Sequence, residues 1–140
     1  PVCAYFGQKA AQQLAVIQRM VRDLNLDVTV IGCPIIREAD GLAKSSRNSY
    51  LSADERKAAL VLSQALEVAK QLLANGEQNA AKIRNAISET IQAEPLAKVD
   101  YVELVDARTL QQVDSVERPV LVALAVYIGK TRLIDNFITE

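Results

Sequence analysis

The chain has 140 residues, 50% of them hydrophobic, and a formal net charge of −1 from 16 basic and 17 acidic side chains. This length is enough for one ordinary core, and the near-neutral balance gives no basic field that would attract DNA, RNA or an acidic membrane. The sequence contains no histidine, which excludes Ser/His and Cys/His nucleophile systems and the usual zinc ligand.

The first quarter of the chain predicts a β-α-β unit. Residues 2–6 are a short apolar strand, and Gly7-Gln8-Lys9 is the turn into a helix over about residues 10–24. Residues 27–34 (DVTVIGCP) predict a second strand, rich in β-branched residues and apolar on both faces, as is typical of a parallel strand covered on both sides. The helix carries one apolar stripe that we expect to be buried, formed by Leu14, Ile17, Met20, Val21 and Leu24.

Two strands and one helix cannot cover both faces of a parallel sheet. The chain also begins at Pro1 without Met, so we expect the rest of the sheet to lie in a missing amino-terminal segment. The bare strand edges favour self-association into a homo-oligomer. Cys3 and Cys33 have neither metal-ligand spacing nor a disulfide framework, and we expect both to be reduced core residues of a cytoplasmic protein.

The remainder predicts a small α+β domain, with two helices packed on an antiparallel sheet. Ser52 and Glu55 form a capping-box pattern that opens a helix ending at Asn75-Gly76. A second helix is expected before Pro95, over about residues 78–93. Strands are expected at residues 99–106, 110–113 and 120–128, with a turn at residues 106–109. We therefore divide the chain into domains at residues 1–35 and 36–140.

Two windows could hold a negatively charged ligand. Gly7-Gln8-Lys9 lies where the first strand leads into its helix, so backbone N–H groups, the helix dipole and a Lys charge would face the ligand. KSSRN, residues 44–48, places two cations and two hydroxyls on one polar loop, which suits a polyphosphate. Each window alone is more typical of a solvated surface than of a ligand site. Their order in one chain is what favours a nucleotide-binding fold.

Four segments together resemble the pantoate–β-alanine ligase (pantothenate synthetase) family: YFGQKAAQQLAVIQRMVRDLN, IREADGLAKSSRNSYLS, YVELVDARTLQQV and IGKTRLIDN. The resemblance runs from Tyr5 almost to Glu140, and the stretch from Asp40 to Leu51 is highly specific to the family. It implies the last β-α-β unit of a Rossmann-like nucleotidyltransferase domain, followed by a small lid domain. It also implies an ATP- and Mg²⁺-dependent ligase of coenzyme A synthesis that joins pantoate to β-alanine through a pantoyl adenylate, releasing AMP and pyrophosphate.

The resemblance assigns roles to particular residues. Nucleotide contacts are implied for Gly7, Gln8, Lys9, Ala10, Ile36, Lys44, Ser45, Ser46 and Arg47. Among these, the catalytic contacts to the phosphates fall on Lys9, Ser45, Ser46 and Arg47, and Gln13 is implied to bind pantoate. No protein ligand to a metal is implied, because Mg²⁺ bridges the phosphates. Two positions depart from the family, which usually has Asp at Ala10 and an apolar residue at Lys44.

The family's amino-terminal half carries a His-based phosphate signature that this chain lacks, so we expect the chain alone not to be a competent ligase. The alternative is a non-catalytic fragment or interaction domain that only associates with itself or with a partner half. RNA binding is disfavoured by the net charge and by an aromatic content of 4%. Arg132 and Asp135 are expected to form a structural ion pair with each other.

Overall fold

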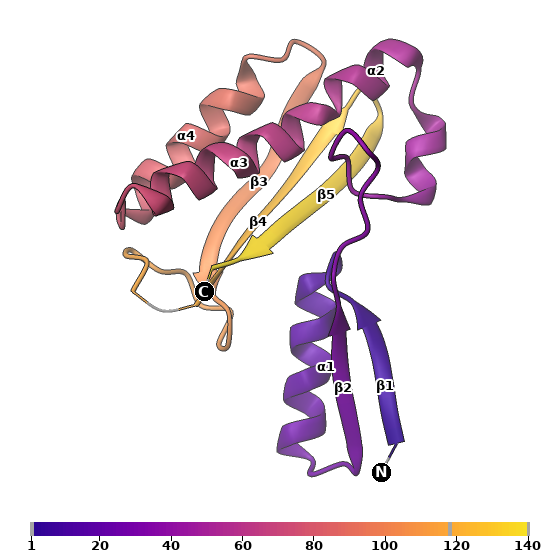
Figure 1. Cartoon of the computed structure of the whole chain (residues 1–140), viewed down its shortest axis with the longest axis vertical. Helices are drawn as coiled ribbons and strands as arrows, with labels where there is room; N and C mark the ends of the chain where they lie inside the picture. Colours follow the sequence, from indigo (N-terminus) through magenta and orange to yellow (C-terminus); the bar gives the residue numbers. More distant parts are fainter. Residues whose placement is uncertain (1, 118, 140) are drawn as a thin grey trace. The chain divides into compact units, whose positions relative to one another are not determined.

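The computed structural model describes residues 2–117 and 119–139. The chain divides into two compact units, Pro1–Ile36 and Arg37–Glu140 (Figure 1). Pro1 and Glu140, the outer bounds of the two predicted domains, lie outside the described residues. Within the described ranges, no helix combines the length and the apolar character needed to cross a membrane.

The first unit is a β-α-β unit. Strands β1 (Val2–Gly7) and β2 (Val28–Cys33) pair in parallel, and helix α1 (Ala11–Asp23) connects them. In Figure 1, α1 runs alongside the two strands. A Cβ on Gly32 would lie 2.9 Å from the Leu14 side chain, so glycine at this position permits the close approach of helix and strand. The predicted order and the parallel pairing are confirmed.

Burial in the first unit differs from the prediction. Among the described side chains of α1, only Leu14 is buried, whereas Met20 and Leu24 of the predicted stripe are 45% and 64% exposed. Cys3 is exposed and Cys33 is only partly buried, so the prediction that both are core residues is wrong. The physical reason is that one helix on a two-stranded sheet provides no second layer to enclose these side chains.

The second unit has helices on one face of an antiparallel sheet, as predicted (Figure 1). Its sheet has the order β3-β4-β5, formed by β3 (Ala97–Asp106), β4 (Val120–Ile128) and β5 (Thr131–Ile138). Helices α3 (Leu60–Ala74) and α4 (Ala80–Gln92) pack against each other and against this sheet. The largest fully buried side chains of the core include Leu62, Ile83, Ile87, Ile91, Leu104, Leu124 and Ile128.

The helix preceding this core begins as predicted but is not continuous. The Ser52 hydroxyl accepts the Glu55 N–H, and the Glu55 carboxylate accepts the Ser52 N–H, which confirms the capping box. The single helix predicted from there is wrong, because α2 (Ala53–Ala58) ends and α3 starts after Ala59. The Leu62 N–H bonds to the Ala59 carbonyl three residues back, a tighter turn than the α-helical spacing.

The sheet differs from the prediction at one strand. The turn at residues 106–109 is confirmed, since the Asp106 carboxylate accepts the N–H groups of Arg108 and Thr109 at 2.8 and 2.9 Å. The strand predicted at residues 110–113 is wrong. Leu110 takes a left-handed φ of 62°, and Gln112 makes only an isolated bridge to Val105. The third strand is instead β5, which follows β4 through a tight hairpin whose first turn residue, Gly129, has φ 60°.

Candidate functional site

The turn between β1 and α1 carries the first group of predicted site residues. The Gln8 N–H donates to the Cys33 carbonyl at 2.8 Å, which fastens the turn to the end of β2. Ala10 is the N-cap of α1, with φ −90° and ψ 62°, and makes no side-chain capping bond. The amides of the first helical turn therefore lack a side-chain cap and lie at the positive end of the helix dipole.

Three other residues of this unit have predicted roles. A Cβ on Gly7 would meet nothing within 4 Å, so packing inside the described chain does not require glycine there. Gln13 is exposed in the first turn of α1. Ile36, the last residue of the first unit, is 69% exposed. The turn and Gln13 thus form one polar end of the β-α-β unit, with side chains accessible to a ligand.

The second group, Lys44 to Arg47, lies in the second unit at the start of a short 3₁₀ helix, η1 (Ser46–Tyr50). The Ser45 hydroxyl caps η1 by accepting the Arg47 N–H at 3.1 Å. Acceptance of this bond leaves the hydroxyl proton of Ser45 able to donate to an anion. Arg47 is exposed and uses one guanidinium donor on the Arg132 carbonyl, at 3.4 Å. A guanidinium has five donors, so most of its capacity remains for a phosphate-like group.

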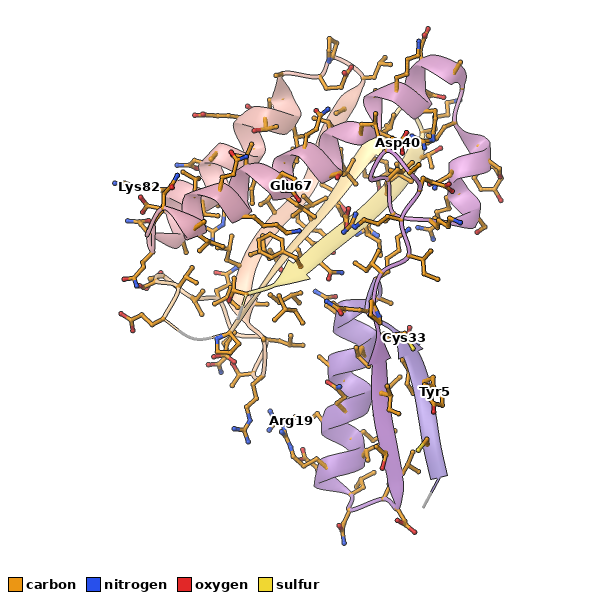
Figure 2. The ribbon with its side chains drawn as sticks, in the orientation of Figure 1. Tyr5, Arg19, Cys33, Asp40, Glu67 and Lys82 are labelled. Carbon is orange, nitrogen blue, oxygen red and sulfur yellow. The ribbon has the colours of Figure 1, made fainter. Side chains whose placement is uncertain are left out.

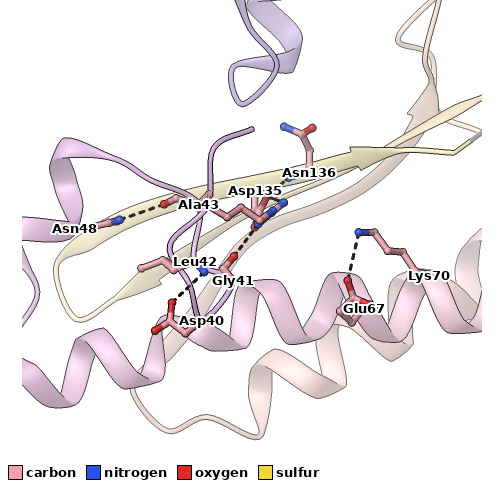
Figure 3. A network of polar contacts seen from close by, with 10 residues as sticks. Asp40, Gly41, Leu42, Ala43, Asn48, Glu67, Lys70, Asp135 and Asn136 are labelled. Atoms are coloured by element: carbon pink, nitrogen blue, oxygen red, sulfur yellow. Dashed lines mark hydrogen bonds and ion pairs between the residues drawn. The ribbon is translucent and has the colours of Figure 1, made fainter. Parts of the chain in front are cut away.

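Residues 37–43, which precede this loop, are held by a buried ion pair (Figure 3). Arg37 forms a two-bond fork with Asp135 of β5, with Nη1 to Oδ2 at 2.7 Å and Nη2 to Oδ1 at 2.8 Å. The Arg37 Nη1 also donates to the Gly41 carbonyl at 3.0 Å. The Asp135 side chain is 1% exposed and that of Arg37 is 30% exposed. The carboxylate is thus almost completely removed from water and depends on Arg37 for its charge partner.

Electrostatics in this network follow from its geometry. The hydrogen bonds to Asp135 raise the pKa of Arg37 above its usual value, against the opposing effect of partial burial, and the negative charges of Asp135 and Glu67 act in the same direction. The Arg56 guanidinium donates to Asp40 at 3.0 Å and holds the pKa of that carboxyl below its usual value. Figure 2 labels Asp40 and Glu67, which lie on the loop and on α3.

Two further contacts make the loop a defined structure rather than a flexible linker. Leu42 and Ala43 are buried, at 2% and 3% exposure. The Asn48 Nδ2 donates to the Ala43 carbonyl at 3.1 Å. Residues 37–48 are therefore a packed segment that presents Lys44, Ser45, Ser46 and Arg47 on a supported backbone.

The predicted ion pair between Arg132 and Asp135 is wrong. Arg132 instead bonds Asp100 of β3 at 2.9 Å, and this bond raises the pKa of Arg132 above its usual value. Residues three apart on a strand point to opposite faces, which separates the two side chains. Asp135 faces the helix side of the sheet, beside Leu133 and opposite Leu124.

Sequence reasoning did not find Arg37 and Asp135 as partners, because 98 positions separate them and local patterns say nothing about such pairs. One signal was available. An aspartate that lies between two apolar residues on one face of a strand, as Asp135 does between Leu133 and Phe137, must have a cationic or hydrogen-bonding partner, because a lone buried charge is strongly unfavourable.

In the part of the chain that the structure describes, no three His, Cys, Asp or Glu side chains gather closely enough to hold a metal ion.

The fold and the two loops define the class of protein. It is an α/β protein whose strand-to-helix turn and Ser- and Arg-bearing loop are both of the kind that bind anions. The chain belongs to the pantoate-beta-alanine ligase family, whose model matches residues 1–138.

Relatives with the name pantothenate synthetase support this membership. The protein of Clostridium acetobutylicum is 64% identical over 137 residues, covering 98% of this chain and 49% of the relative. That of Enterococcus faecalis is 63% identical over 137 residues, again 98% of this chain and 49% of the relative. The chain thus spans about half the length of the curated relatives it matches.

Solved structures agree. The pantothenate synthetase of Thermus thermophilus matches with a TM-score of 0.90 and 42% identity, over 98% of this chain and 49% of that one. A pantoate-beta-alanine ligase from Francisella tularensis, complexed with beta-gamma ATP and beta-alanine, matches with a TM-score of 0.61 and 30% identity, over 99% of this chain and 44% of that one.

Proposed function

We propose that this chain is the carboxyl-terminal half of an ATP-dependent pantoate–β-alanine ligase. The observation that carries the proposal is the match of residues 1–138 to the family, together with 64% identity to a pantothenate synthetase that is about twice as long. The two anion-type loops support it independently, since both are accessible and contain the residue types that bind phosphates. The Francisella protein, whose structure was solved in complex with beta-gamma ATP and beta-alanine, points the same way.

The proposed reaction has two steps. An oxygen of the pantoate carboxylate attacks the α-phosphorus of ATP, the bond to the β-phosphate oxygen breaks, and pyrophosphate leaves. The amine of β-alanine then attacks the acyl carbon of pantoyl adenylate, AMP leaves with the bonding electrons, and the amine loses a proton. Both steps spread negative charge over phosphate oxygens, so stabilisation by fixed cations and N–H donors is the main contribution expected from the protein.

In the first unit, we assign Lys9 to the charge that develops at the α-phosphate, and Gln13 to pantoate. Gly7, Gln8 and Ala10 contact the ribose and phosphates through the turn, and Ile36 contacts adenine through its backbone. The uncapped helix start fits this assignment, because its amides have no competing side-chain acceptor at Ala10. Residues 1–35 are then the last β-α-β unit of a Rossmann-like domain.

In the second unit, the loop of Lys44, Ser45, Ser46 and Arg47 holds the phosphates. Ser45 donates its hydroxyl proton while it continues to cap η1, and Arg47 offers the donors not used on Arg132. Mg²⁺ supplies charge neutralisation to the phosphates when bound. Residues 36–140 would then act as a lid domain.

Half of the enzyme is expected to be insufficient. The reactants must be held in one geometry to gain the positioning part of catalysis, and the half that we propose to be missing supplies the remaining contacts. We therefore propose that the chain alone is inactive, that it associates with the amino-terminal half or with itself, and that the parent enzyme is a cytoplasmic homo-oligomer. Sedimentation of the chain as a strict monomer at high concentration would count against self-association.

A second candidate function is a non-catalytic interaction module. The apolar side chains left exposed on the first unit, such as Met20 and Leu24, favour it to the extent that they need a covering partner. This candidate predicts no dependence of ATP affinity on Lys9 or Arg47.

ATP affinity measured with the chain and the amino-terminal half together distinguishes these candidates. K9A and R47A should each weaken binding by about 10-fold or more, the scale of a lost charge-assisted hydrogen bond. K82A is the matched control, because Lys82 is an exposed cation on α4 (Figure 2). Equal affinities for all three variants and the unmodified chain would contradict the proposed function.

A further inference from the structure

We propose that the Arg37–Asp135 pair is a clamp that holds the loop of residues 44–48 in its anion-binding conformation, so that both are positioning residues for the nucleotide. This inference rests on the proposed function for its consequence, but the clamp itself is a property of the second unit and can be tested without ATP. Neither residue carries any of the site roles assigned above.

The first end of the loop segment is fixed by the fork on Arg37. Its two bonds to Asp135 attach residue 37 to the middle of β5, and its third bond, to the Gly41 carbonyl, closes the turn at residues 38–42. The Glu38 N–H reaches the Leu42 carbonyl at 2.8 Å, and Arg37 bridges Ala43 in antiparallel fashion. The Arg37 guanidinium therefore fixes the position of the backbone at Ala43, from which the loop of residues 44–48 begins.

The far end of the segment is fixed to the same strand. Arg47 bonds the carbonyl of Arg132, three residues before Asp135 on β5. The Asn48 side chain, directly after Arg47, bonds the Ala43 carbonyl, so the loop is closed on itself. Strand β5 thus supports both ends, and the two hydroxyl residues lie between them.

The burial of Asp135 explains why the clamp cannot easily open. With its side chain 1% exposed, the carboxylate has no bulk water to replace Arg37 when the fork separates. Figure 3 shows Asp135 on β5 and the Glu67–Lys70 pair on α3. The Glu67 carboxylate forms a salt bridge with Lys70 at 3.3 Å. It therefore does not replace Asp135 as the partner of Arg37. The geometry favours one closed arrangement over an ensemble of loop positions, which is the condition for pre-organised binding.

The chain provides a matched control on the same strand. Arg132 and Asp100 also form an Arg–Asp pair, at 2.9 Å, but both side chains are more than a third exposed and Arg47 contacts only the main-chain carbonyl of Arg132. D100N therefore removes a comparable ion pair without touching the clamp. D135N removes the negative charge and one of the two acceptor oxygens of the fork, with almost no change in side-chain shape.

The first arm is amide hydrogen exchange on the chain without ligand. D135N should speed exchange by about 10-fold or more at the hydrogen-bonded amides of the segment, while amides in the centre of β4 keep their protection. D100N should leave both sets unchanged. The segment amides to follow are those of Glu38, Gly41, Arg47 and Asn48.

The second arm is steady-state kinetics with the amino-terminal half present. If the ordered loop falls to about a tenth of the population, the KM for ATP should rise by about 10-fold, with a smaller change in kcat. R37K keeps the positive charge but loses the fork, and should give an intermediate KM. A purely structural defect would lower the active fraction and leave the KM for ATP unchanged.

The two arms separate the possible failures. Equal exchange in D135N and the unmodified chain, or equal acceleration by D135N and D100N, would overturn the clamp. Faster loop exchange with an unchanged KM for ATP would overturn the role of the clamp in nucleotide positioning.

If the two unmodified halves together do not use ATP, the proposed function fails, while the exchange measurement still decides whether the clamp exists. If D135N also loses protection in β4, R37K becomes the deciding variant, and faster exchange confined to the loop segment supports the clamp.

Discussion

The two units of this chain have similar apolar patterns but bury them very differently. In the first unit, Leu14 is the one described hydrophobic side chain that is buried, whereas the other buried hydrophobic residues, from Leu42 to Leu133, belong to the second unit. The second unit has two helices over three strands and closes a core, but the first has one helix over two strands. Apolar periodicity therefore identifies which face of a helix or strand can be buried. Burial of that face also requires another helix or sheet that packs against it.

Removal of one apolar side chain from each unit tests this difference in burial most directly. I87A should destabilise the second unit by about 2–5 kcal/mol, because Ile87 is fully buried and its loss leaves a cavity. M20A in the first unit should cost only about 0.5 kcal/mol or less, because Met20 is 45% exposed. Urea unfolding followed by circular dichroism measures both. Similar losses for the two variants would show that the first unit has a closed core of its own.

The next largest effect concerns the Arg37–Asp135 ion pair of the second unit. R37A should destabilise the second unit by about 2–3 kcal/mol. Removal of one partner of a fully buried pair costs about 3–5 kcal/mol, and the smaller loss is expected because the Arg37 side chain is partly exposed. R19A removes the exposed Arg19–Asp23 pair of α1 and should cost about 0.5 kcal/mol or less. Thermal unfolding of the two variants is the measurement. A smaller loss for R37A than for R19A would contradict the burial argument.

Helix capping gives a third contrast. Asn79 caps α4 by accepting the Lys82 N–H at 3.2 Å, but α1 begins at Ala10 without a side-chain cap. N79A should therefore lose about 1 kcal/mol of stability, and A10D should gain about 1 kcal/mol. Urea titrations should show the midpoint moving in opposite directions for the two variants. A fall in stability for A10D would mean that the backbone at this position cannot present a cap.

The smallest expected effect is the pH dependence of Asp40. Arg56 lowers the pKa of the Asp40 carboxyl in the folded chain. The ionised carboxylate therefore stabilises the fold at pH values above the pKa of the unfolded chain, about 3.9. This contribution is lost as the pH falls through the lower pKa of the folded chain. D40N should therefore be less stable than the unmodified chain at pH 7, and the difference should vanish in acid. The midpoints of urea unfolding of D40N and the unmodified chain, measured from pH 7 down to pH 2, would show this pH-dependent difference. A constant difference over this range would contradict the linkage.

These contrasts also explain what the sequence could predict. Elements defined by local signals were predicted well, such as the capping box at Ser52 and the turn at Asp106. Errors arose where a distant contact decides the outcome. Strand β5 was missed because its buried face alternates Leu133, Asp135 and Phe137, and the charge interrupts the apolar pattern. The distant partner Arg37 supplies the opposite charge that makes this burial possible, and no local pattern reveals it.

The predicted site residues depended on a different kind of information. The turn at Gly7 to Ala10 and the loop at Lys44 to Arg47 could be singled out by residue type, and the structure shows accessible side chains in both. Their roles in a reaction came from family resemblance. The support beneath the loop could not be predicted, because it comes from β5, through contacts between residues that are 98 and 85 positions apart in the chain.

The most direct test of the account is pantoate- and β-alanine-dependent formation of AMP from ATP. It should be measured for this chain alone, for a separately produced amino-terminal half alone, and for the two mixed. We predict that neither half forms AMP above background and that the mixture does, with loss of activity when R47A replaces the unmodified chain. AMP formation by this chain alone at the rate of the mixture, or none in a mixture shown to associate, would contradict the account.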